Sequence, residues 1–237
     1  LMDNKLLVIT GGSKGIGRSI ILKFVKYNFD IITCSRSLDD LSKLKNDVEK
    51  ISNSISLNYI ETDLSLQTDC NKFVDFINSF KRVPDILVNN VGIFAPGKIY
   101  NEEKGILEKM ISTNLYSNYF ISRGIIPNML SKKNGHIFNI CSIASKKAYS
   151  NGGAYCVSKF ALYGMSLCLR EELKDHGIKV TSVIPGATLT SSWDGTDFDE
   201  GRFVMPEDIA ESIFSIFNMS KGTNVEEIII RPHLGDI

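Results

Sequence analysis

The sequence of 237 residues has no excess of charge of either sign and no long hydrophobic run. Lysine plus arginine and aspartate plus glutamate each total 27, so no net field favours binding to nucleic acid or to an anionic membrane. No apolar run approaches the length that crosses a bilayer, and the opening residues LMDNKLLVIT lack the layout of a signal peptide. We therefore expect a cytoplasmic protein with neither a nucleic-acid nor a membrane partner.

Cysteine and histidine are too few and too scattered for a disulfide framework or a metal site. The five cysteines are odd in number and contain no C-x-x-C pair, which is typical of reduced, mostly buried thiols. The three histidines, His136, His176 and His233, show no ligand spacing, which favours surface or helix-cap positions. We expect no metal.

What the sequence does contain is an ordinary globular composition, 43% hydrophobic and 23% charged, arranged in alternating strand-like and helical segments. Strands are expected at 6–10, 30–35, 56–61, 85–90, 136–141, 179–184 and 226–231. Because these runs are apolar throughout, both of their faces should be buried, as in a parallel sheet covered by helices. No linker or repeat divides the chain. The sequence predicts one α/β domain over 1–237, a doubly wound three-layer Rossmann fold with a seven-stranded parallel sheet.

Two of the helical segments are unusual. The stretch 104–131 is long for one helix and is expected to end near Pro127. The helix expected at 152–175 carries apolar residues on more than one face, as a helix does when it is central to the core or packed against a partner subunit. We expect both, and therefore a homo-oligomer, either a homodimer or a homotetramer.

The first strand runs into the stretch TGGSKGIG (10–17), and a helical pattern follows at once. Glycine permits a tight turn with bare backbone amides and lets the helix approach the sheet closely. Those amides and the helix N-terminus would hold the pyrophosphate of a dinucleotide. The residues expected to bind this part of the cofactor are Gly11, Ser13, Lys14, Gly15, Ile16 and Gly17.

The end of the second strand distinguishes NADP(H) from NAD(H). An NAD-binding fold usually places an acidic residue there for the ribose 2′-hydroxyl, whereas this chain has Ser35 and Arg36. Arg36 can hold a 2′-phosphate, with Lys14 as a second cation, and we expect NADP(H) as the cofactor. Asp39 and Asp40 are interpreted as the cap and first turn of the next helix. The alternative is that both cations are ordinary surface residues.

The segment AYCVSKFAL (154–162) places Tyr155 and Lys159 four residues apart, on one face of a helix. Alone, this spacing favours a half-buried tyrosine beside a surface lysine, which any helix can contain. However, TGGSKGIG, NNVG (89–92), Asn114, Ser142, YCVSK (155–159) and PGATLT (185–190) follow one another in order. With these motifs the chain resembles the short-chain dehydrogenase/reductase family over almost its whole length, including NADP-dependent carbonyl and 3-oxoacyl reductases.

The resemblance implies four catalytic residues. Tyr155 would protonate the carbonyl oxygen as hydride arrives, and Lys159 would favour the phenolate of a group whose free pKa is about 10. Ser142, 13 residues before the tyrosine, would hydrogen-bond the same oxygen. Asn114 would help to hold a water molecule beside Lys159.

The resemblance also implies further cofactor contacts. Asp63 and Leu64 match the position that contacts adenine, although Asp63 could instead cap the following helix. Along the ribose and the nicotinamide the matching residues are Asn90, Val91, Gly92, Tyr155, Lys159, Pro185, Gly186, Thr188 and Thr190. Val91 replaces the alanine usual in that motif.

The segment 189–204 lies where the family has its substrate lid. Trp193, Phe198 and Phe203 would line an apolar pocket opposite Ile93 and Phe94, or would merely pin the loop. Lys133 and Arg170 correspond to positions that dock a carrier protein in 3-oxoacyl reductases, although Arg170 also occurs in relatives with other substrates. Lys146 and Lys147 would attract an acidic substrate or solvate their loop.

Three hypotheses for function follow. The first is an NADPH-dependent reductase of a small-molecule ketone or aldehyde, with a 3-oxoacyl thioester, carrier-linked or not, or a small 3-oxo or 3-hydroxy acid among its candidate substrates. The second is an NAD-linked alcohol dehydrogenase with the same fold. The third is a nucleotide-sensing regulator that binds the cofactor without turnover, although the set Asn114, Ser142, Tyr155 and Lys159 argues against it.

Overall fold

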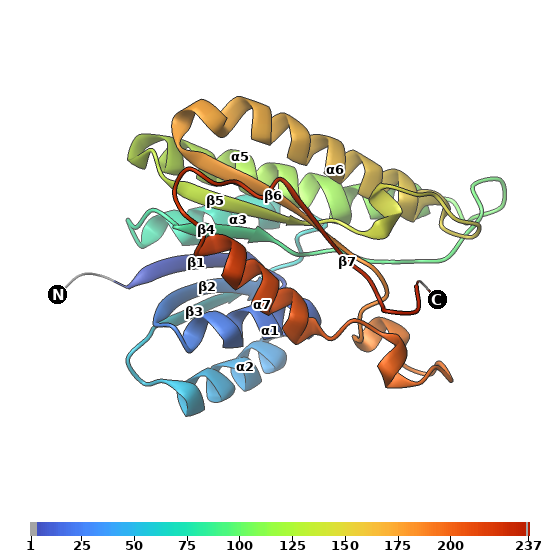
Figure 1. The fold of residues 1–237 in the computed structure, drawn as a ribbon, viewed down its shortest axis with the longest axis horizontal. Helices are drawn as coiled ribbons and strands as arrows, with labels where there is room; N and C mark the ends of the chain where they lie inside the picture. Colours follow the sequence, from blue (N-terminus) through green and yellow to red (C-terminus); the bar gives the residue numbers. More distant parts are fainter. Residues whose placement is uncertain (1–3, 236) are drawn as a thin grey trace.

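A sheet of seven parallel strands forms the centre of the molecule, a computed structural model that describes residues 4–235 and 237 (Figure 1). The strands are β1 (Lys5–Thr10), β2 (Phe29–Ser35), β3 (Leu57–Glu61), β4 (Ile86–Asn89), β5 (Gly135–Ile140), β6 (Ile178–Pro185) and β7 (Glu227–Ile230). Their order across the sheet is β3-β2-β1-β4-β5-β6-β7, and every neighbouring pair is parallel. All seven expected strands are present with their ends within one residue, and the predicted fold class is confirmed.

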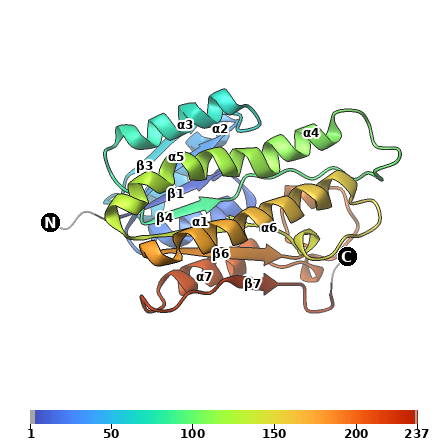
Figure 2. The ribbon, with the colours of Figure 1, turned by 90° about the horizontal axis from the view of Figure 1, so that it is seen from above.

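Helices cover both faces of this sheet and make three layers (Figures 1 and 2). One face carries α1 (Gly15–Val25), α2 (Leu38–Ile51) and α7 (Pro206–Phe217). The other carries α3 (Gln67–Ser79), α5 (Ser117–Lys132) and α6 (Gly153–Leu173), with the short α4 (Ile106–Ile111) before α5.

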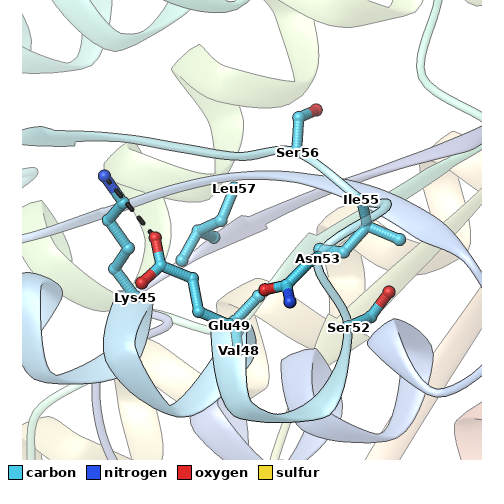
Figure 3. Close-up of a pocket in the computed structure, with 8 residues that line it drawn as sticks. All are labelled: Lys45, Val48, Glu49, Ser52, Asn53, Ile55, Ser56 and Leu57. Carbon is cyan, nitrogen blue, oxygen red and sulfur yellow. Dashed lines mark ion pairs between the residues drawn. The ribbon is translucent and has the colours of Figure 1, made fainter.

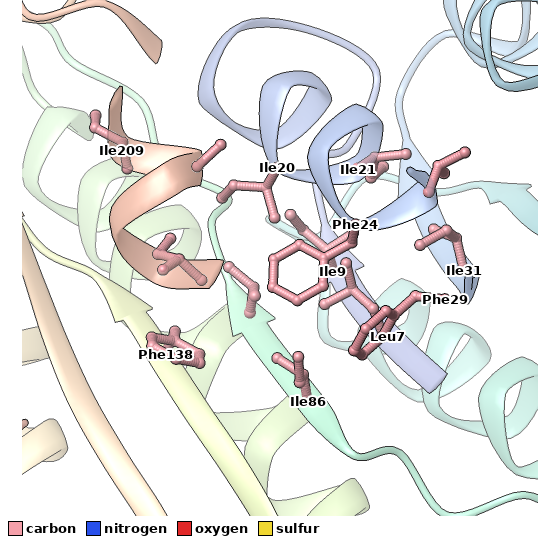
Figure 4. Close-up of a cluster of buried hydrophobic side chains, with 14 of the residues drawn as sticks. Leu7, Ile9, Ile20, Ile21, Phe24, Phe29, Ile31, Ile86, Phe138 and Ile209 are labelled. Carbon is pink, nitrogen blue, oxygen red and sulfur yellow. The ribbon is translucent and has the colours of Figure 1, made fainter. Parts of the chain in front are cut away.

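Each interface between the sheet and a helical layer is a hydrophobic core. Under α1 and α7, Phe24 is fully buried and packs edge-on against Phe29, with ring centroids 4.9 Å apart (Figure 4). Under α3 and α5, Phe73 and Ile125 are fully buried against the opposite side of the sheet. Each such side chain contributes roughly 1.5–3 kcal/mol on burial, so the two cores hold the strands in fixed register.

A buried polar network joins β4, β5 and β6 to the helices above them. Asn89 donates to Ser122 of α5 and to Asn139, both at 2.8 Å. Asn139 in turn donates to Ser166 of α6 at 2.9 Å, and Ser182 donates to the same hydroxyl at 2.8 Å. Because buried polar groups need partners, this network fixes where α6 lies on the sheet.

The chain between residues 104 and 132 differs from the expectation. A π-helical turn, Ser112–Tyr116, separates α4 from α5, and α5 does not end near Pro127 but continues to Lys132. A proline inside a helix costs about 3 kcal/mol. The helix continues because Ile121, Ile125 and Met129 are fully buried on its inner face, and their burial outweighs that cost.

His136 is also not where the sequence led us to expect it. It is a buried residue of β5, stacked on Phe138 at 3.9 Å between ring centroids and hydrogen-bonded through Nε2 to Thr181 at 2.8 Å. Burial lowers the pKa of His136 to about 3, so the ring is neutral at ordinary pH. His176, by contrast, is exposed.

The cysteines, the potential metal ligands and the lengths of the helices can also be compared with the sequence analysis. Cys34, Cys70, Cys141 and Cys156 are buried and unbonded, and Cys168 is exposed. Within the described residues, no group of three or more potential ligands is arranged to hold a metal ion, and no helix combines the length and apolarity that a membrane span requires.

Candidate active site

The glycine-rich loop joins β1 to α1 at the point where the strand order reverses, between β1 and β4. In a parallel sheet this crevice at the carboxyl ends is where ligands bind. Gly11 and Gly15 have φ values of +66° and +51°, which other residues rarely adopt. A methyl group on Gly17 would lie 2.3 Å from the carbonyl oxygen of Gly11, so only glycine allows the helix this close.

Within the described residues, no side chain caps the N-terminus of α1. Its N-cap residue, Lys14, makes no side-chain capping bond, and no acidic residue lies in the first turn. Free N–H groups at a helix start favour an anion. The loop therefore fits the pyrophosphate of a dinucleotide.

Two residues that the sequence reasoning omitted complete this loop. Thr10 accepts hydrogen bonds from the amides of Asn90 and Val91 at 2.9 and 3.0 Å, and the Asn90 side chain donates back to the carbonyls of Thr10 and Gly11. A methyl group on Gly12 would lie 2.3 Å from Oγ1 of Thr33. Both residues stand inside TGGSKGIG, which could have indicated them.

The residues expected to bind the 2′-phosphate lie together at the end of β2, but Lys14 forms an ion pair with an acidic side chain of the protein. The hydroxyl of Ser13 donates to that of Ser35 at 2.8 Å, and Arg36 is exposed beside them. Lys14 makes an ion pair of 2.8 Å with Asp40, which lowers the pKa of that carboxyl. The cap of α2 is not an aspartate, since Ser37 accepts from the amide of Asp40.

Asp63 and Leu64 lie before α3 without capping it. Asp63 accepts from the amide of Ser65 at 3.0 Å, and its own amide donates to Asp69 at 2.7 Å. The helix begins at Gln67. The side chain of Leu64 is buried in the core, so a ligand could reach only the backbone of this residue.

A cleft of about 860 Å³ opens at the carboxyl edge of the sheet. Ser142, Tyr155 and Lys159 all line it, which brings together residues from the end of β5 and from α6. Of the expected cofactor contacts, Ile16, Asn90, Gly92, Pro185, Gly186, Thr188 and Thr190 also line it. Asn114 and Val91 are not among the residues that line it.

The three side chains have distinct electrostatic surroundings. Burial raises the pKa of Tyr155, and a hydrogen bond with Ser142 opposes that rise. Burial lowers the pKa of Lys159 to about 8. The ammonium lies 5.9 Å from the centroid of the Tyr155 ring and donates to the carbonyl of Ile140 at 2.9 Å.

Asn114 lies in the π-helical turn and is fully buried. Its Oδ1 accepts from the amide of Ile93 at 2.7 Å, and its Nδ2 donates to the carbonyl of Ile93 and to Ser158 at 3.0 and 2.9 Å. Both amide hydrogens are therefore engaged in holding protein groups. A methyl group on Gly92 would lie 3.3 Å from Nζ of Lys159 and 3.4 Å from Oδ1, so the two side chains meet there.

The residues of the expected substrate side divide into two groups. Ile93, Phe94 and Trp193 line the cleft, whereas Phe198 and Phe203 do not and instead pack around the indole. The segment 189–204 consists of loops and 3₁₀ turns, and its base is closed by a bridge between Thr188 and Val204.

Two of the four basic residues considered for substrate binding form ion pairs with acidic groups. Lys146 binds Glu227 at 2.7 Å, and Arg170 binds Glu226 at 2.8 Å. Lys147 lines the cleft. Pro96, Tyr149 and Asn151 line it too, although no sequence pattern indicated that they belong to the site.

A second, smaller hollow of about 270 Å³ lies between the end of α2 and the start of β3 (Figure 3). Its wall contains an ion pair of 3.8 Å between Lys45 and Glu49. This is the opposite edge of the sheet from the cleft, and none of the expected site residues lines it.

Comparison with known proteins agrees with this geometry. The sequence profile of the short chain dehydrogenase family matches residues 5–200. A sepiapterin reductase of Chlorobaculum tepidum is 32% identical over 98% of both chains. A metagenomic short-chain oxidoreductase solved in complex with NADP is 26% identical over 96% of both chains, with a TM-score of 0.84. The L-sorbose reductase of Gluconobacter frateurii, solved with NADPH and L-sorbose, has the same fold at 23% identity, 98% coverage of both chains and a TM-score of 0.89.

Proposed function

Because this chain belongs to the short-chain dehydrogenase family of oxidoreductases, we propose that it uses NADPH to reduce a ketone or aldehyde to an alcohol. The observation that carries the proposal is the placement of Ser142, Tyr155 and Lys159 in one cleft, where Ser142 lowers the pKa of Tyr155 against the effect of burial. The same cleft reaches Ile16, at the uncapped start of α1. A hydride donor and a proton donor could therefore act on one carbonyl group.

Bound NADPH would supply the hydride to the carbonyl carbon. The hydroxyl of Ser142 would hold the carbonyl oxygen in place and stabilise the charge that develops on it. The phenol of Tyr155 would give its proton to that oxygen, and the Lys159 ammonium would stabilise the phenolate left behind. Asn114 would help to hold a water molecule beside Lys159, through which the proton would be returned.

The preference for NADPH is proposed from the residues at the end of β2. These are Ser35 and Arg36, and neither is acidic. A guanidinium that is exposed and planar suits a 2′-phosphate. The metagenomic relative solved with NADP supports the same cofactor. Asp63 and Leu64 would lie near its adenine. The rest of the molecule would be held by Gly11, Ser13, Lys14, Gly15, Ile16, Gly17, Ser35, Asn90, Val91, Gly92, Pro185, Gly186, Thr188 and Thr190.

The substrate is proposed to be a small carbonyl compound with an apolar or aromatic part. Phe94 and Trp193 offer aromatic surface, and the segment 189–204 would act as the lid. The ion pair of Arg170 with Glu226 argues against a carrier-protein docking role for that residue. The name of the Chlorobaculum relative adds sepiapterin to the compounds worth testing.

The test is to follow loss of nicotinamide absorbance when the purified protein is mixed with NADPH and a panel of ketones and aldehydes, including sepiapterin, a 3-oxo acid and a 3-oxoacyl thioester. Reduction of at least one compound, faster with NADPH than with NADH, supports the proposal. Tighter binding of NADH would favour the NAD-linked dehydrogenase instead. Cofactor binding with no turnover across the panel would favour the nucleotide-sensing regulator.

We also propose a homo-oligomer, formed through the layer of α4, α5 and α6. The large apolar side chains exposed on these helices and on the π-helical turn between α4 and α5 are Leu107, Tyr116, Tyr119, Val157, Phe160 and Leu167. Exposed apolar side chains gathered on one layer are typical of a protein interface.

A further inference from the structure

Helix α6 carries Tyr155 in its first turn but has no cap of its own. Its N-cap residue is Gly152, which has no side chain to accept a hydrogen bond, and no acidic residue lies in the first turn. The first N–H groups of any helix lack partners within the helix. Those of α6 must therefore find acceptors elsewhere.

A loop far away in the sequence supplies them. This capping loop, residues 93–102, follows β4 and lies against the start of α6. The amide of Gly153 donates to the carbonyl of Gly97 at 2.9 Å, and the amide of Ala154 donates to the carboxylate of Glu102 at 3.3 Å. A carboxylate at this end also interacts favourably with the helix dipole.

Glycines on both sides make this approach possible. The amide of Gly97 donates to the carbonyl of Asn151 at 2.9 Å, in a bridge that pairs Gly97 with Gly152. A methyl group on Gly153 would lie 3.0 Å from both the Gly97 carbonyl and Oε2 of Glu102. Any larger residue at this position would press the capping loop away from the helix.

The same loop also contacts the tyrosine ring and the next turn of the helix. Phe94 packs edge-on against Tyr155, with centroids 5.0 Å apart and an interplanar angle of 83°. Asn114 fixes the start of the loop by its two bonds to Ile93 and is joined to α6 through Ser158. The capping loop therefore contacts the start of α6 at two places: the backbone just before Tyr155, and the ring of Tyr155 itself.

We propose that Glu102 is a positioning residue for the reduction: its carboxylate caps α6 and thereby fixes the height of the Tyr155 hydroxyl against Ser142. Glu102 does not line the cleft, so its effect passes through the helix and not through the substrate. This inference rests on the proposed function, because it assigns Tyr155 the role of proton donor.

The test compares three variants of the full-length protein. Glu102→Ala removes the acceptor, Glu102→Gln keeps an oxygen that can accept, and Glu103→Ala changes an exposed neighbour for which no side-chain contact with α6 is found among the described residues. The measurements are kcat and KM with NADPH and the best carbonyl compound of the panel, together with deuterium exchange of the amides of residues 153–156.

Glu102→Ala should lower kcat by about 10- to 100-fold, as expected when a reacting group is displaced by a fraction of an ångström to 1 Å. Its KM for NADPH should stay within about twofold, because the glycine-rich loop is untouched, whereas a general loss of structure would change both constants. Glu102→Gln should recover most of the rate, and Glu103→Ala should resemble the wild type. Exchange should accelerate only in Glu102→Ala.

A wild-type kcat in Glu102→Ala, or a Glu102→Gln variant as slow as the alanine variant, would overturn the inference. If the wild type reduces no compound of the panel, the proposed function itself fails. The exchange measurement then still decides the cap, since unchanged exchange in Glu102→Ala overturns it.

Discussion

The ammonium of Lys159 lies 2.9 Å from the carbonyl oxygen of Ile140, the last residue of β5. The bond ties α6 to the strand that ends two residues before Ser142, so it helps to set the separation of the two side chains that would hold a carbonyl oxygen. Burial lowers the pKa of Lys159 to about 8, and its charge is therefore lost within an accessible range of pH.

The rate of reduction should depend on this charge. As pH rises through about 8, Lys159 loses its proton and no longer stabilises the Tyr155 phenolate, so kcat for reduction should fall. Below pH 8, Lys159→Met should be slower than the wild type by at least about 100-fold, and because its profile should lack this step, the difference should shrink above pH 8. A kcat that stays level in the wild type from pH 7 to well above 8 contradicts the role given to Lys159.

The ion pair between Lys14 and Asp40 should weaken the preference for NADPH. Asp40→Asn leaves the lysine free for the 2′-phosphate, and we expect NADPH to bind up to about fivefold more tightly, the range of an exposed ion pair. Binding of NADH should not change. Asp39→Asn is the matched control, an exposed acid one residue away. Titration of each variant with both cofactors measures the effect, and equal gains for NADH and NADPH would disprove the explanation.

Removal of Arg36 is the converse experiment. Arg36→Ala should weaken NADPH binding by about 10- to 100-fold, the contribution of a charge-assisted hydrogen bond, and leave NADH binding unchanged. Unaltered selectivity would mean that Arg36 is an ordinary surface cation.

The buried His136 should make the protein less stable in acid. Its pKa is about 3 in the folded protein and about 6.5 when unfolded, so only the unfolded chain takes up a proton between these values. The free energy of unfolding should therefore fall with decreasing pH below 6.5, with a contribution from this ring of about 1.4 kcal/mol per pH unit. Denaturant titrations at a series of pH values measure this dependence. In His136→Gln the free energy of unfolding should change less steeply with pH than in the wild type. In His176→Gln, which changes an exposed ring, it should change as steeply as in the wild type.

The exposed face of α6 should be an interface between subunits. Phe160 is 44% exposed on the helix that also exposes Val157 and Leu167, so Phe160→Asp should reduce the molecular mass in solution to that of a monomer. Leu38→Asp, a change at an exposed position of α2, should not. Light scattering distinguishes the outcomes, and a Phe160→Asp protein of wild-type mass would place the interface elsewhere.

The repeating features of the fold could be predicted from the sequence. The strands are predictable because their apolar runs are buried on both faces, and the glycine-rich loop because TGGSKGIG stands between the first strand and a helix. The structure gives Gly11 and Gly15 of that loop positive φ. Tyr155 and Lys159 were predicted to share a helix face because they are one turn apart, and both do line the cleft.

The features that could not be predicted depend on pairs of residues distant in sequence. Nothing near Glu102 indicates that it caps α6, 52 positions away. In the sequence, Lys14 and Asp40 are 26 positions apart and nothing indicates that they form an ion pair in the folded protein. Pro127 has the usual signature of a helix end, but burial of Ile125 and Met129 on either side of it decides otherwise. In each case tertiary contacts outweigh the local pattern.

The most direct test of the account replaces Tyr155 with phenylalanine. The change removes the hydroxyl alone and leaves the ring against Phe94. With NADPH prebound, the rate of a single turnover of the carbonyl substrate should fall by at least about 100- to 10,000-fold, the contribution of a general acid, while NADPH affinity stays within about twofold. A Tyr155→Phe protein that reduces the carbonyl at the wild-type rate would contradict the assignment of Tyr155 as the proton donor.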